Sequence, residues 1–470
     1  MKKIALMYLA FFTPFLFAQW EPEIRLTFDD STSYTSINNA RWVSAEGNII
    51  HAVWYDHRDG NDEIYYKRST DDGTNWGADT RLTDEPQTSA YPSIATSGDN
   101  IHIVWFDGRD FNWEIYYKRS TDGGLTWEPD TGLTLDPANS QFTSVAVSGT
   151  NVHVVWREER DGNLEIYYKR STDNGTTWES DIRLTSNTAR SVEPTVAASE
   201  SYVHVAWSDD RDTNWEIYYK RSTDGGVTWE PDMRFTNNPT RSEFNSIAVS
   251  GSNVHVVWQN NYDIYHRRST DDGLTWEPDT ALTDFGLARN PSIVSSGNNL
   301  HVVWFDYRDS NYEIYYKRST DNGITWEPDT RLTDNAFFSA RPSATCSDSG
   351  VHVIFYEDRD GNYEIYYKRN PTGNPGVQDR SYSTNISEIL FVPTIFRDRI
   401  KIRFTQPSEK RLHLTLYNIY GAKLWEKSYS NTPSSLVIHD AEIRRLPAAV
   451  YFLFVSSDKR KFGSVKLIKQ

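Results

Sequence analysis

The sequence predicts an all-β protein, a seven-bladed β-propeller followed by a small β-sandwich. Three observations lead to this fold class: a unit of about 50 residues is repeated seven times, aromatic residues make up 14% of the chain, and no long segment has helical periodicity. A period near 50 residues made of short strands is typical of propellers. Aromatic and β-branched side chains also fit pleated surfaces, so the composition favours the same fold.

Each unit contains recognisable segments in a fixed order. The first is HVVW or a variant of it, at His51–Trp54, His102–Trp105, His153–Trp156, His204–Trp207, His255–Trp258, His301–Trp304 and His352–Phe355. The second is EIYYKR, which begins at Glu63, Glu114, Glu165, Glu216, Glu313 and Glu364, with the variant DIYHRR from Asp263. The third is S-T-D-x-G-x-x-W, and spacings of 51, 51, 51, 47 and 50 residues separate its aspartates.

We expect four strands in each unit. An inner strand such as Pro92–Ser97 precedes the HVVW strand, EIYYKR is the third strand, and the TWEPDTRLT segment is the outer one. Both faces of a propeller blade pack against neighbouring blades, which explains why apolar and polar residues do not alternate cleanly in these strands.

The two ends of the repeat array predict how the ring closes. The seventh unit has no third segment after EIYYKR, so its outer strand is missing, and Glu23–Thr27 matches the outer-strand pattern RLT of the other units. A strand from the N-terminus is therefore expected to complete the last blade, which leaves no open sheet edge. Residues 19–370 are assigned to the propeller.

The first 18 residues predict a secretory signal peptide. Lys2 and Lys3 precede an apolar run of 14 residues, Ile4–Phe17, and a small residue, Ala18, stands at the expected cleavage point. The run is too short to span a membrane, so we expect an exported chain without a transmembrane helix.

The segment Ser120–Trp127 resembles the Asp box of the sialidase-like (BNR repeat) propellers, and the resemblance covers residues 19–370. Its chemistry indicates a structural role, because Ser and Asp side chains bond turn backbone and glycine permits positive φ. The predicted Asp-box residues are Asp71, Asp122, Asp173, Asp224, Asp271 and Asp321, with Trp76, Trp127, Trp178, Trp229, Trp276 and Trp326. The resemblance implies that a ligand binds at the opposite face of the ring.

The hairpins between the second and third strands are candidate ligand sites on that opposite face. They read D-x-R-D-x-N, except in the fifth unit, whose hairpin is shorter by four residues and lacks the arginine. The arginines either pair with carboxylates of their own loops or form a ring that grips an anionic or polyhydroxyl ligand. The candidate residues are Asp56, Arg58, Asp107, Arg109, Glu158, Arg160, Asp209, Arg211, Asp306, Arg308, Glu357 and Arg359.

Other loops expected on this face differ from unit to unit, which is where a binding site would depart from the scaffold. They carry aromatic and arginine residues suited to sugar or peptide binding. These residues are Tyr91, Phe142, Arg190, Arg241, Phe244, Arg289, Phe337, Phe338 and Arg341.

The composition excludes some classes of function. Residues 1–370 carry a net charge of −24, which argues against nucleic acid as a partner. One cysteine, Cys346, permits no intrachain disulfide. We expect no cofactor and no metal, because the D-x-R-D pattern places a guanidinium where a cation would sit.

We interpret the protein as a secreted, surface-associated binding or scaffold module for a glycan or an exported protein. The alternative is an exo-sialidase-type glycoside hydrolase, and a third possibility is a structural surface protein without a specific ligand. The sialidase resemblance implies three arginines, a Tyr–Glu pair and an acid loop. No such set can be assigned in units this similar, because an acid and a nucleophile need different environments.

The C-terminal segment is a separate basic unit. Residues 371–384 are a predicted linker, residues 385–470 a β-sandwich, and residues 371–470 carry a net charge of +8. This unit resembles the sorting domain of type IX secretion at Tyr417–Gly421, Leu446–Tyr451 and Lys466–Lys469, although Pro393–Phe396 and Ala449 depart from the family pattern. The resemblance implies contact with an outer-membrane secretion machinery and cleavage of the tail; a sandwich that stays attached is the alternative.

Overall fold

The computed structural model describes residues 20–36, 39–284, 286–348 and 350–373, together with eight strands of the C-terminal segment. The signal-peptide prediction for residues 1–18 lies outside the described residues. The chain divides into two compact units, residues 1–378 and 379–470. Among the described residues every regular element is a strand, and no helix is long and apolar enough to cross a membrane.

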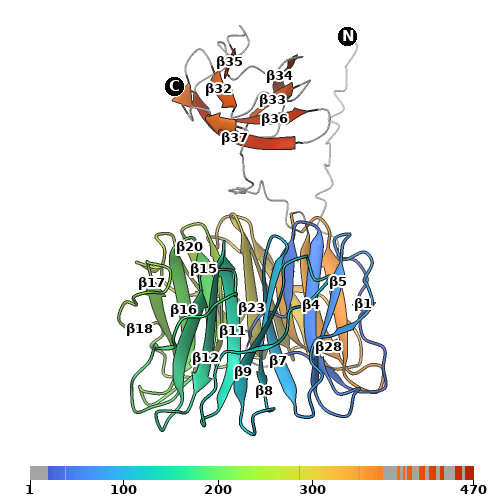
Figure 1. Ribbon diagram of the computed structural model, residues 1–470, viewed down its shortest axis with the longest axis vertical. Helices are drawn as coiled ribbons and strands as arrows, with labels where there is room; N and C mark the ends of the chain where they lie inside the picture. Colours follow the sequence, from blue (N-terminus) through green and yellow to red (C-terminus); the bar gives the residue numbers. More distant parts are fainter. Residues whose placement is uncertain are drawn as a thin grey trace, which may run out of the picture. The chain divides into compact units, whose positions relative to one another are not determined.

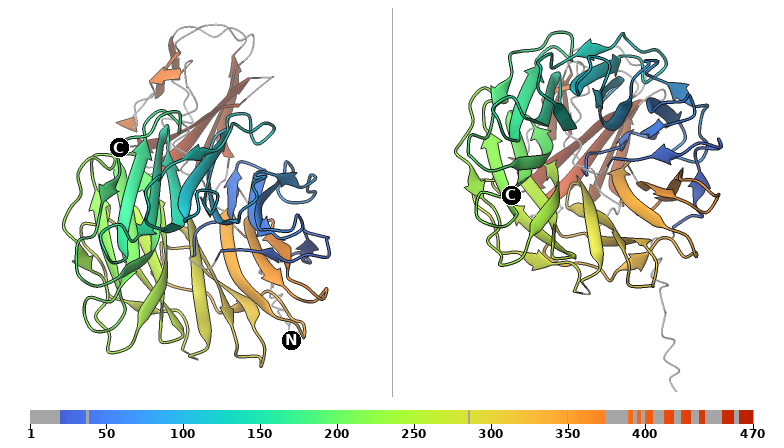
Figure 2. Two further views of the ribbon diagram at one scale, coloured as in Figure 1. Left: turned by 60° about the horizontal axis from the view of Figure 1, so that its bottom comes forward. Right: turned by 90° about the horizontal axis from the view of Figure 1, so that it is seen from below.

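The first unit is a ring of seven antiparallel sheets, as the sequence predicts (Figures 1 and 2). The first blade has β2 (Ser33–Tyr34), β3 (Val43–Glu46), β4 (Ile49–Asp56), β5 (Glu63–Ser69) and β6 (Thr80–Arg81). The second has β7 (Ser89–Ser97), β8 (Asn100–Asp107), β9 (Glu114–Ser120) and β10 (Thr131–Gly132). The third has β11 (Ser140–Ser148), β12 (Asn151–Glu158), β13 (Glu165–Ser171) and β14 (Ile182–Arg183).

The remaining blades repeat this arrangement. The fourth has β15 (Ser191–Ser199), β16 (Tyr202–Asp209), β17 (Glu216–Ser222) and β18 (Met233–Arg234). The fifth has β19 (Ser242–Ser250), β20 (Asn253–Asn260), β21 (Asp263–Ser269) and β22 (Thr280–Ala281). The sixth has β23 (Ala288–Ser296), β24 (Asn299–Asp306), β25 (Glu313–Ser319) and β26 (Thr330–Arg331). The seventh has β27 (Ser339–Cys346), β28 (Val351–Glu357) and β29 (Glu364–Asn370).

The ring closes as predicted. Strand β1 (Ile24–Arg25) pairs with β29 in antiparallel register, and Leu26 N–H donates to the carbonyl of Ile365 at 2.8 Å. The fourth strands are much shorter than the expected TWEPDTRLT segment, since only two residues of each are paired.

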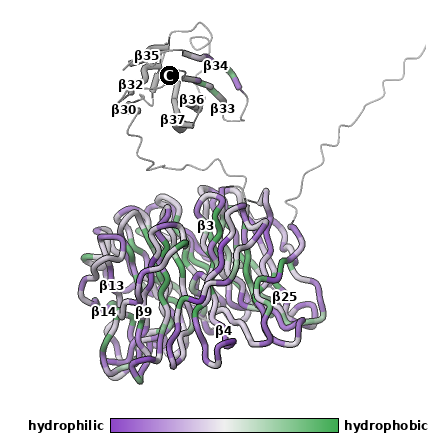
Figure 3. The backbone as a smooth tube through the Cα atoms, turned by 45° about the vertical axis from the view of Figure 1, so that its right-hand side comes forward, coloured by the Kyte–Doolittle hydropathy of each residue, from purple (hydrophilic) through white to green (hydrophobic). Residues whose placement is uncertain are grey.

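Neighbouring blades are joined by two repeated contacts. The arginine of EIYYKR donates to a backbone carbonyl of the next Asp box, for example Arg68 to Gly123 at 2.6 Å, and Arg369 of the last blade donates to Asp72 of the first. The Asp-box tryptophan packs edge-on against a tyrosine of the preceding blade, as Trp127 does on Tyr66. Hydrophobic segments lie within the wall of the ring and hydrophilic segments at the turns (Figure 3).

The second unit consists of two sheets. One contains β30 (Ile389–Phe391), β32 (Ile400–Phe404) and β35 (Ser435–Ile438). The other contains β31 (Ile395–Phe396), β33 (Leu412–Asn418), β34 (Lys423–Tyr429), β36 (Val450–Ser457) and β37 (Lys461–Lys469). Two sheets agree with the small β-sandwich expected from the sequence.

Candidate functional site

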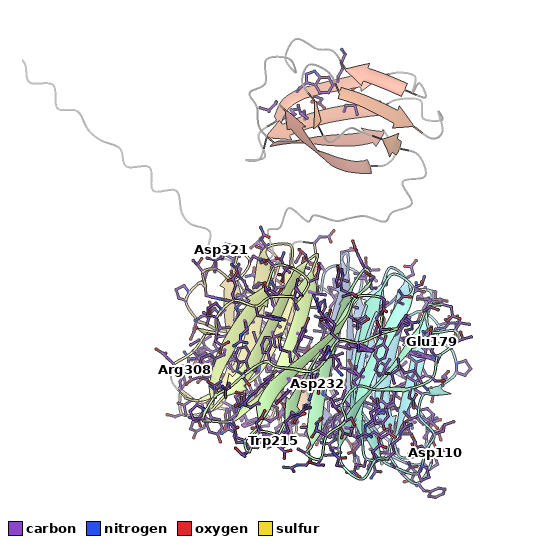
Figure 4. All side chains as sticks on the ribbon, turned by 90° about the vertical axis from the view of Figure 1, so that its left-hand side faces the viewer. Asp110, Glu179, Trp215, Asp232, Arg308 and Asp321 are labelled. Carbon is purple, nitrogen blue, oxygen red and sulfur yellow. The ribbon has the colours of Figure 1, made fainter. Side chains whose placement is uncertain are left out.

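The ring has two ends with different loops. The Asp boxes lie between the third and fourth strands at one end, called here the Asp-box end, and the hairpins between the second and third strands lie at the other, the hairpin end. Figure 4 shows this separation: Asp321 of an Asp box lies at one end of the ring, and Asp110 and Trp215 of two hairpins lie at the opposite end. Each inner strand begins at the hairpin end.

The Asp boxes are turns held by their own side chains. Asp122 accepts hydrogen bonds from the Ser120 hydroxyl at 2.7 Å and from the backbone and hydroxyl of Thr126 at 2.9 and 2.6 Å. These bonds hold the pKa of Asp122 well below its usual value. The same bonding recurs at Asp71, Asp173, Asp224, Asp271 and Asp321. This geometry agrees with the structural role expected from the sequence.

The six hairpin arginines are engaged in ion pairs within their blades. Arg109 binds Asp107 through two nitrogens, at 2.9 and 2.7 Å, and also reaches Asp130 at 3.0 Å. Its guanidinium lies 4.1 Å from the ring centre of Tyr116. Asp107 is fully buried and also accepts from Ser89 at 2.7 Å and from the Trp105 indole at 2.8 Å.

The other hairpins repeat this clamp, in which a buried carboxylate receives the arginine. The pairs are Asp56–Arg58, Glu158–Arg160, Asp209–Arg211, Asp306–Arg308 and Glu357–Arg359. Burial raises the pKa of Asp107, but hydrogen bonds from Arg109, Trp105 and Ser89 outweigh it and leave this pKa below its usual value. The contacts favour the structural interpretation of these twelve residues, and ligand binding by them stays a prediction.

The fifth blade has the shorter hairpin that the sequence indicates. Asn260 pairs with Asp263, so the turn consists of Asn261 and Tyr262 alone, and both have positive φ, 48° and 71°. Two central residues with positive φ define the hairpin turn that matches the twist of the strands.

A different set of residues gathers where the inner strands begin. In each inner strand from the second to the seventh blade, two consecutive residues near the start are unpaired at a register shift. The first of these two residues has positive φ. These residues are Tyr91, Phe142, Glu193, Phe244, Asn290 and Arg341, and Asn39 of the first blade, which also has positive φ, is grouped with them. Beside them lie the residues that follow the HVVW segment: Tyr55, Phe106, Arg157, Ser208, Gln259, Phe305 and Tyr356. We call these fourteen residues the axial cluster.

Aromatic side chains dominate one arc of the axial cluster. Tyr91 stacks on Phe106 with ring centres 4.9 Å apart and lies 5.0 Å from Tyr55 and 5.6 Å from Phe142. In the last blade Tyr356 lies 5.0 Å from Tyr363, which continues the aromatic surface. Burial and the neighbouring Tyr91 raise the pKa of Tyr55 strongly, so the Tyr55 phenol is neutral at neutral pH.

Charged side chains occupy the other arc. Ser208 donates to Glu193 at 3.3 Å, and Arg157 lies over the Phe142 ring at 4.1 Å while donating to Gln141 at 3.0 Å. Surroundings that exclude water and the charge of nearby Glu243 together raise the pKa of Glu193 to about 7, although Arg157 opposes part of the shift. Glu193 therefore holds a proton in part of the molecules at neutral pH.

Three arginines at this end differ from the hairpin arginines. Among the described residues no carboxylate lies within ion-pair distance of Arg157, Arg289 or Arg341, although most other arginines of the ring have one. Arg289 lies over Tyr262 at 4.6 Å, and Arg341 lies 5.8 Å from the ring centre of Tyr356. These guanidiniums keep hydrogen-bond donors for an acidic group.

The sequence pointed to part of this cluster. Tyr91, Phe142, Phe244 and Arg341 appeared as scattered loop residues, and the structure brings them to one equivalent position. Two others, Arg190 and Arg241, instead pair with Asp210 and Glu243 at 2.7 and 2.6 Å. Glu193 and Arg157 were missed. Within the described residues no group of three or more His, Cys, Asp or Glu side chains is placed to hold a metal ion.

Comparisons with known proteins agree with this fold. A model described as a BNR repeat-containing family member matches residues 3–154, and the BNR/Asp-box repeat model matches residues 317–328. No curated protein matches the chain. The chain is therefore a β-propeller, and these two segments of it are similar to BNR repeats.

Solved structures show the same architecture. A PL25 ulvan lyase bound to -[GlcA(1-4)Rha3S]- is similar with a TM-score of 0.54 and 12% identity, over 74% of this chain and 95% of that one. The polysaccharide lyase Uly1 is similar with a TM-score of 0.52 and 10% identity, over 75% of this chain and 99% of that one. For an α-L-arabinofuranosidase of Fusarium graminearum in complex with arabinobiose, the TM-score is 0.44 and the identity 15%, over 59% of this chain and 91% of that one. At 12% and 10% identity, the two lyases show a likeness of fold alone.

Proposed function

We propose that the propeller binds a glycan carrying an acidic group, and that it does so at the axial cluster. The observation that carries this proposal is the variety at equivalent positions. Six register-shift positions hold Tyr91, Phe142, Glu193, Phe244, Asn290 and Arg341, while the segments that build the blades are nearly identical. A requirement of folding would repeat in every blade, whereas a single ligand on the ring axis meets each blade differently.

The chemistry of the cluster fits a sugar with a carboxylate or sulfate. Aromatic faces such as Tyr91 and Phe142 suit the C–H faces of sugar rings, and neighbouring polar groups suit hydroxyls. Arg157, Arg289 and Arg341 supply charge-assisted donors that no described carboxylate occupies. The ulvan lyase of the same fold, bound to -[GlcA(1-4)Rha3S]-, supports testing acidic glycans first.

We propose further that the protein is an exported binding or scaffold module. Residues 1–18 would direct export, and residues 385–470 would contact an outer-membrane secretion machinery. Mass spectrometry of the secreted protein tests this part, because a mature form that still contains Lys466 contradicts cleavage of the tail. Binding of an exported protein at the axial cluster in place of a glycan would appear as no retention of any glycan.

The test of glycan binding uses the whole protein and a panel of sialosides, uronate-containing and neutral glycans, with affinities measured by calorimetry. Arg341→Met is expected to weaken binding of the acidic glycan at least tenfold, since a hydrogen bond to a charged group contributes about 1.5–3 kcal/mol. Its stability is expected to change little, because Arg341 has no carboxylate partner among the described residues.

The matched control is Arg109→Met. It breaks the pair with the buried Asp107 and is expected to lower the unfolding free energy by about 3–5 kcal/mol while leaving affinity unchanged in the folded protein. Equal loss of affinity in both variants, or no binding of any acidic glycan, contradicts the proposal.

A second candidate function is a glycoside hydrolase of sialidase type. Glu193 favours it, because a carboxyl group with a pKa of about 7 can protonate a leaving oxygen at neutral pH. Incubation of the panel with the protein and detection of released sugar by mass spectrometry distinguishes the two. Release that Glu193→Gln abolishes establishes the hydrolase, and retention without release establishes the binding module.

A further inference from the structure

The inner strand of the first blade is interrupted by a segment that the other blades lack. Tyr34 pairs with Tyr55, and the carbonyl of Trp42 accepts from Val53 N–H, so seven residues of sequence lie between Tyr34 and Trp42. The second blade has only two residues, Tyr91 and Pro92, between the corresponding Ala90 and Ser93. This insertion makes the first blade the one whose inner strand differs most from its repeats.

The end of the insertion crosses the centre of the ring. Asn39 donates to the carbonyl of Phe244 in the fifth blade at 2.7 Å, and Asn290 of the sixth blade donates to Asn39 at 3.3 Å. Arg41 donates to the carbonyl of Ile247 in the fifth blade at 3.3 Å. A segment of the first blade that bonds to the fifth and sixth blades spans the channel between the inner strands.

The same segment is tied to the blades on its own side. The backbone carbonyl of Arg41 accepts from Ile94 N–H of the second blade at 2.9 Å, and the N–H of Trp42 donates to the Ser343 hydroxyl of the seventh at 3.2 Å. Four other blades, the second, fifth, sixth and seventh, therefore hold the segment in place, which fixes the Arg41 guanidinium inside the channel.

No acidic group faces this guanidinium. Among the described residues Arg41 has no carboxylate within ion-pair distance, and its one hydrogen-bonded partner is the Ile247 carbonyl. Burial lowers the pKa of Arg41, and the titratable group that acts against this is the thiol of Cys346. Burial raises the pKa of that thiol to about 12, so it is neutral and cannot balance the charge.

An enclosed cation without a counter-charge is costly. Desolvation of a single ion in a protein costs several kcal/mol, and an arginine cannot relieve the cost by losing its proton. Part of the Arg41 surface stays accessible, which leaves room beside the guanidinium. The backbone carbonyl of Ser295 lies 3.9 Å from the Cys346 sulfur. The hydroxyl of the same serine is buried and has no hydrogen-bond partner among the described residues.

We propose that the central channel contains an anion-binding site at the Arg41 guanidinium, and that its ligand is a small monovalent inorganic anion, chloride in ordinary salt solutions. The anion balances the charge of Arg41 and so fixes the crossing segment between the blades. Arg41 follows the axial cluster residue Asn39 by two positions in the chain. Binding of the anion at Arg41 does not depend on the glycan proposed above.

The first test is thermal unfolding of the whole protein at constant ionic strength, with sodium chloride replaced stepwise by sodium gluconate, whose anion is too large for the site. Chloride is expected to raise the midpoint saturably by roughly 1–3 °C. Arg41→Met removes the charge and is expected to lose this dependence. The control Arg68→Met removes another arginine without a described carboxylate partner, at the Asp-box end, and should keep it.

The second test does not depend on a variant. Crystals of the wild-type protein grown in sodium bromide are expected to give an anomalous peak within hydrogen-bond distance of the Arg41 guanidinium. A map without a peak there at saturating bromide overturns the proposal, and so does a chloride dependence that Arg41→Met retains in full.

Discussion

Closure of the ring by the N-terminal strand can be tested by removing it. A protein that begins at Asp29 lacks β1 and Leu26, which is fully buried, and leaves Glu364, also fully buried, without the Arg25 guanidinium at 2.7 Å and the Thr27 hydroxyl. Loss of a buried leucine costs about 2–5 kcal/mol, and an uncompensated buried carboxylate about 3–5 kcal/mol. Their sum is comparable with the whole stability of a typical protein.

The assay is urea unfolding followed by tryptophan fluorescence, with the protein that begins at Trp20 as reference. We expect the shortened protein to unfold at a far lower urea concentration or not to fold. Leu26→Ala and Leu82→Ala provide a matched pair, because Leu82 holds the equivalent position in the first blade and is 5% exposed. Both should lower the unfolding free energy by about 2–5 kcal/mol.

The refuting result is equally definite. If the protein that begins at Asp29 unfolds at the same urea concentration as the reference, or if Leu26→Ala is neutral while Leu82→Ala is destabilising, the N-terminal strand does not hold the ring closed.

Two further predictions concern an Asp box and the axial cluster. Gly124→Ala is expected to lower the unfolding free energy by about 3 kcal/mol or more, because the φ of Gly124 is 82° and a Cβ would lie 2.1 Å from the Tyr66 hydroxyl. The control Gly149→Ala places its Cβ in open space and should lower the unfolding free energy by only about 1 kcal/mol in the same urea assay. Burial and the charge of Glu243 raise the pKa of Glu193 to about 7, so the folded state binds this proton more tightly, and stability falls as pH rises from about 4.3 to 7. Melting points across this range should fall less in Glu193→Gln than in the wild type; parallel curves contradict the shift.

The repeat made most of the ring predictable from sequence. Seven blades, closure by residues 23–27 and the short fifth hairpin all follow from comparing units, because identical segments must form identical strands. The length of the fourth strand was overestimated, since similarity between units does not show where backbone pairing stops. Only two residues, such as Thr131 and Gly132, are paired.

The axial cluster was harder to predict because its residues are dissimilar. Tyr91, Glu193, Asn290 and Arg341 each precede a proline near the start of an inner strand, and this shared proline is the signal that aligns them. The crossing of the ring by Asn39 and Arg41 has no such signal. An extra length of chain in the first unit indicates an insertion, but its partners Phe244 and Ile247 lie some 200 residues away and are met only in the closed ring.

The positions of the chain ends bear on how the ring is used. The N–H of Glu21 donates to the carbonyl of Arg369 at 2.9 Å, and Arg369 in turn donates to Asp72 of an Asp box. The chain therefore enters and leaves the ring at the Asp-box end, whereas the axial cluster lies where the inner strands begin, at the hairpin end. A segment that follows Gly373 starts from the end opposite the proposed glycan site. The proposed glycan site thus lies at the end of the ring away from the points where the described chain enters and leaves it, so neither of these two connections covers the site.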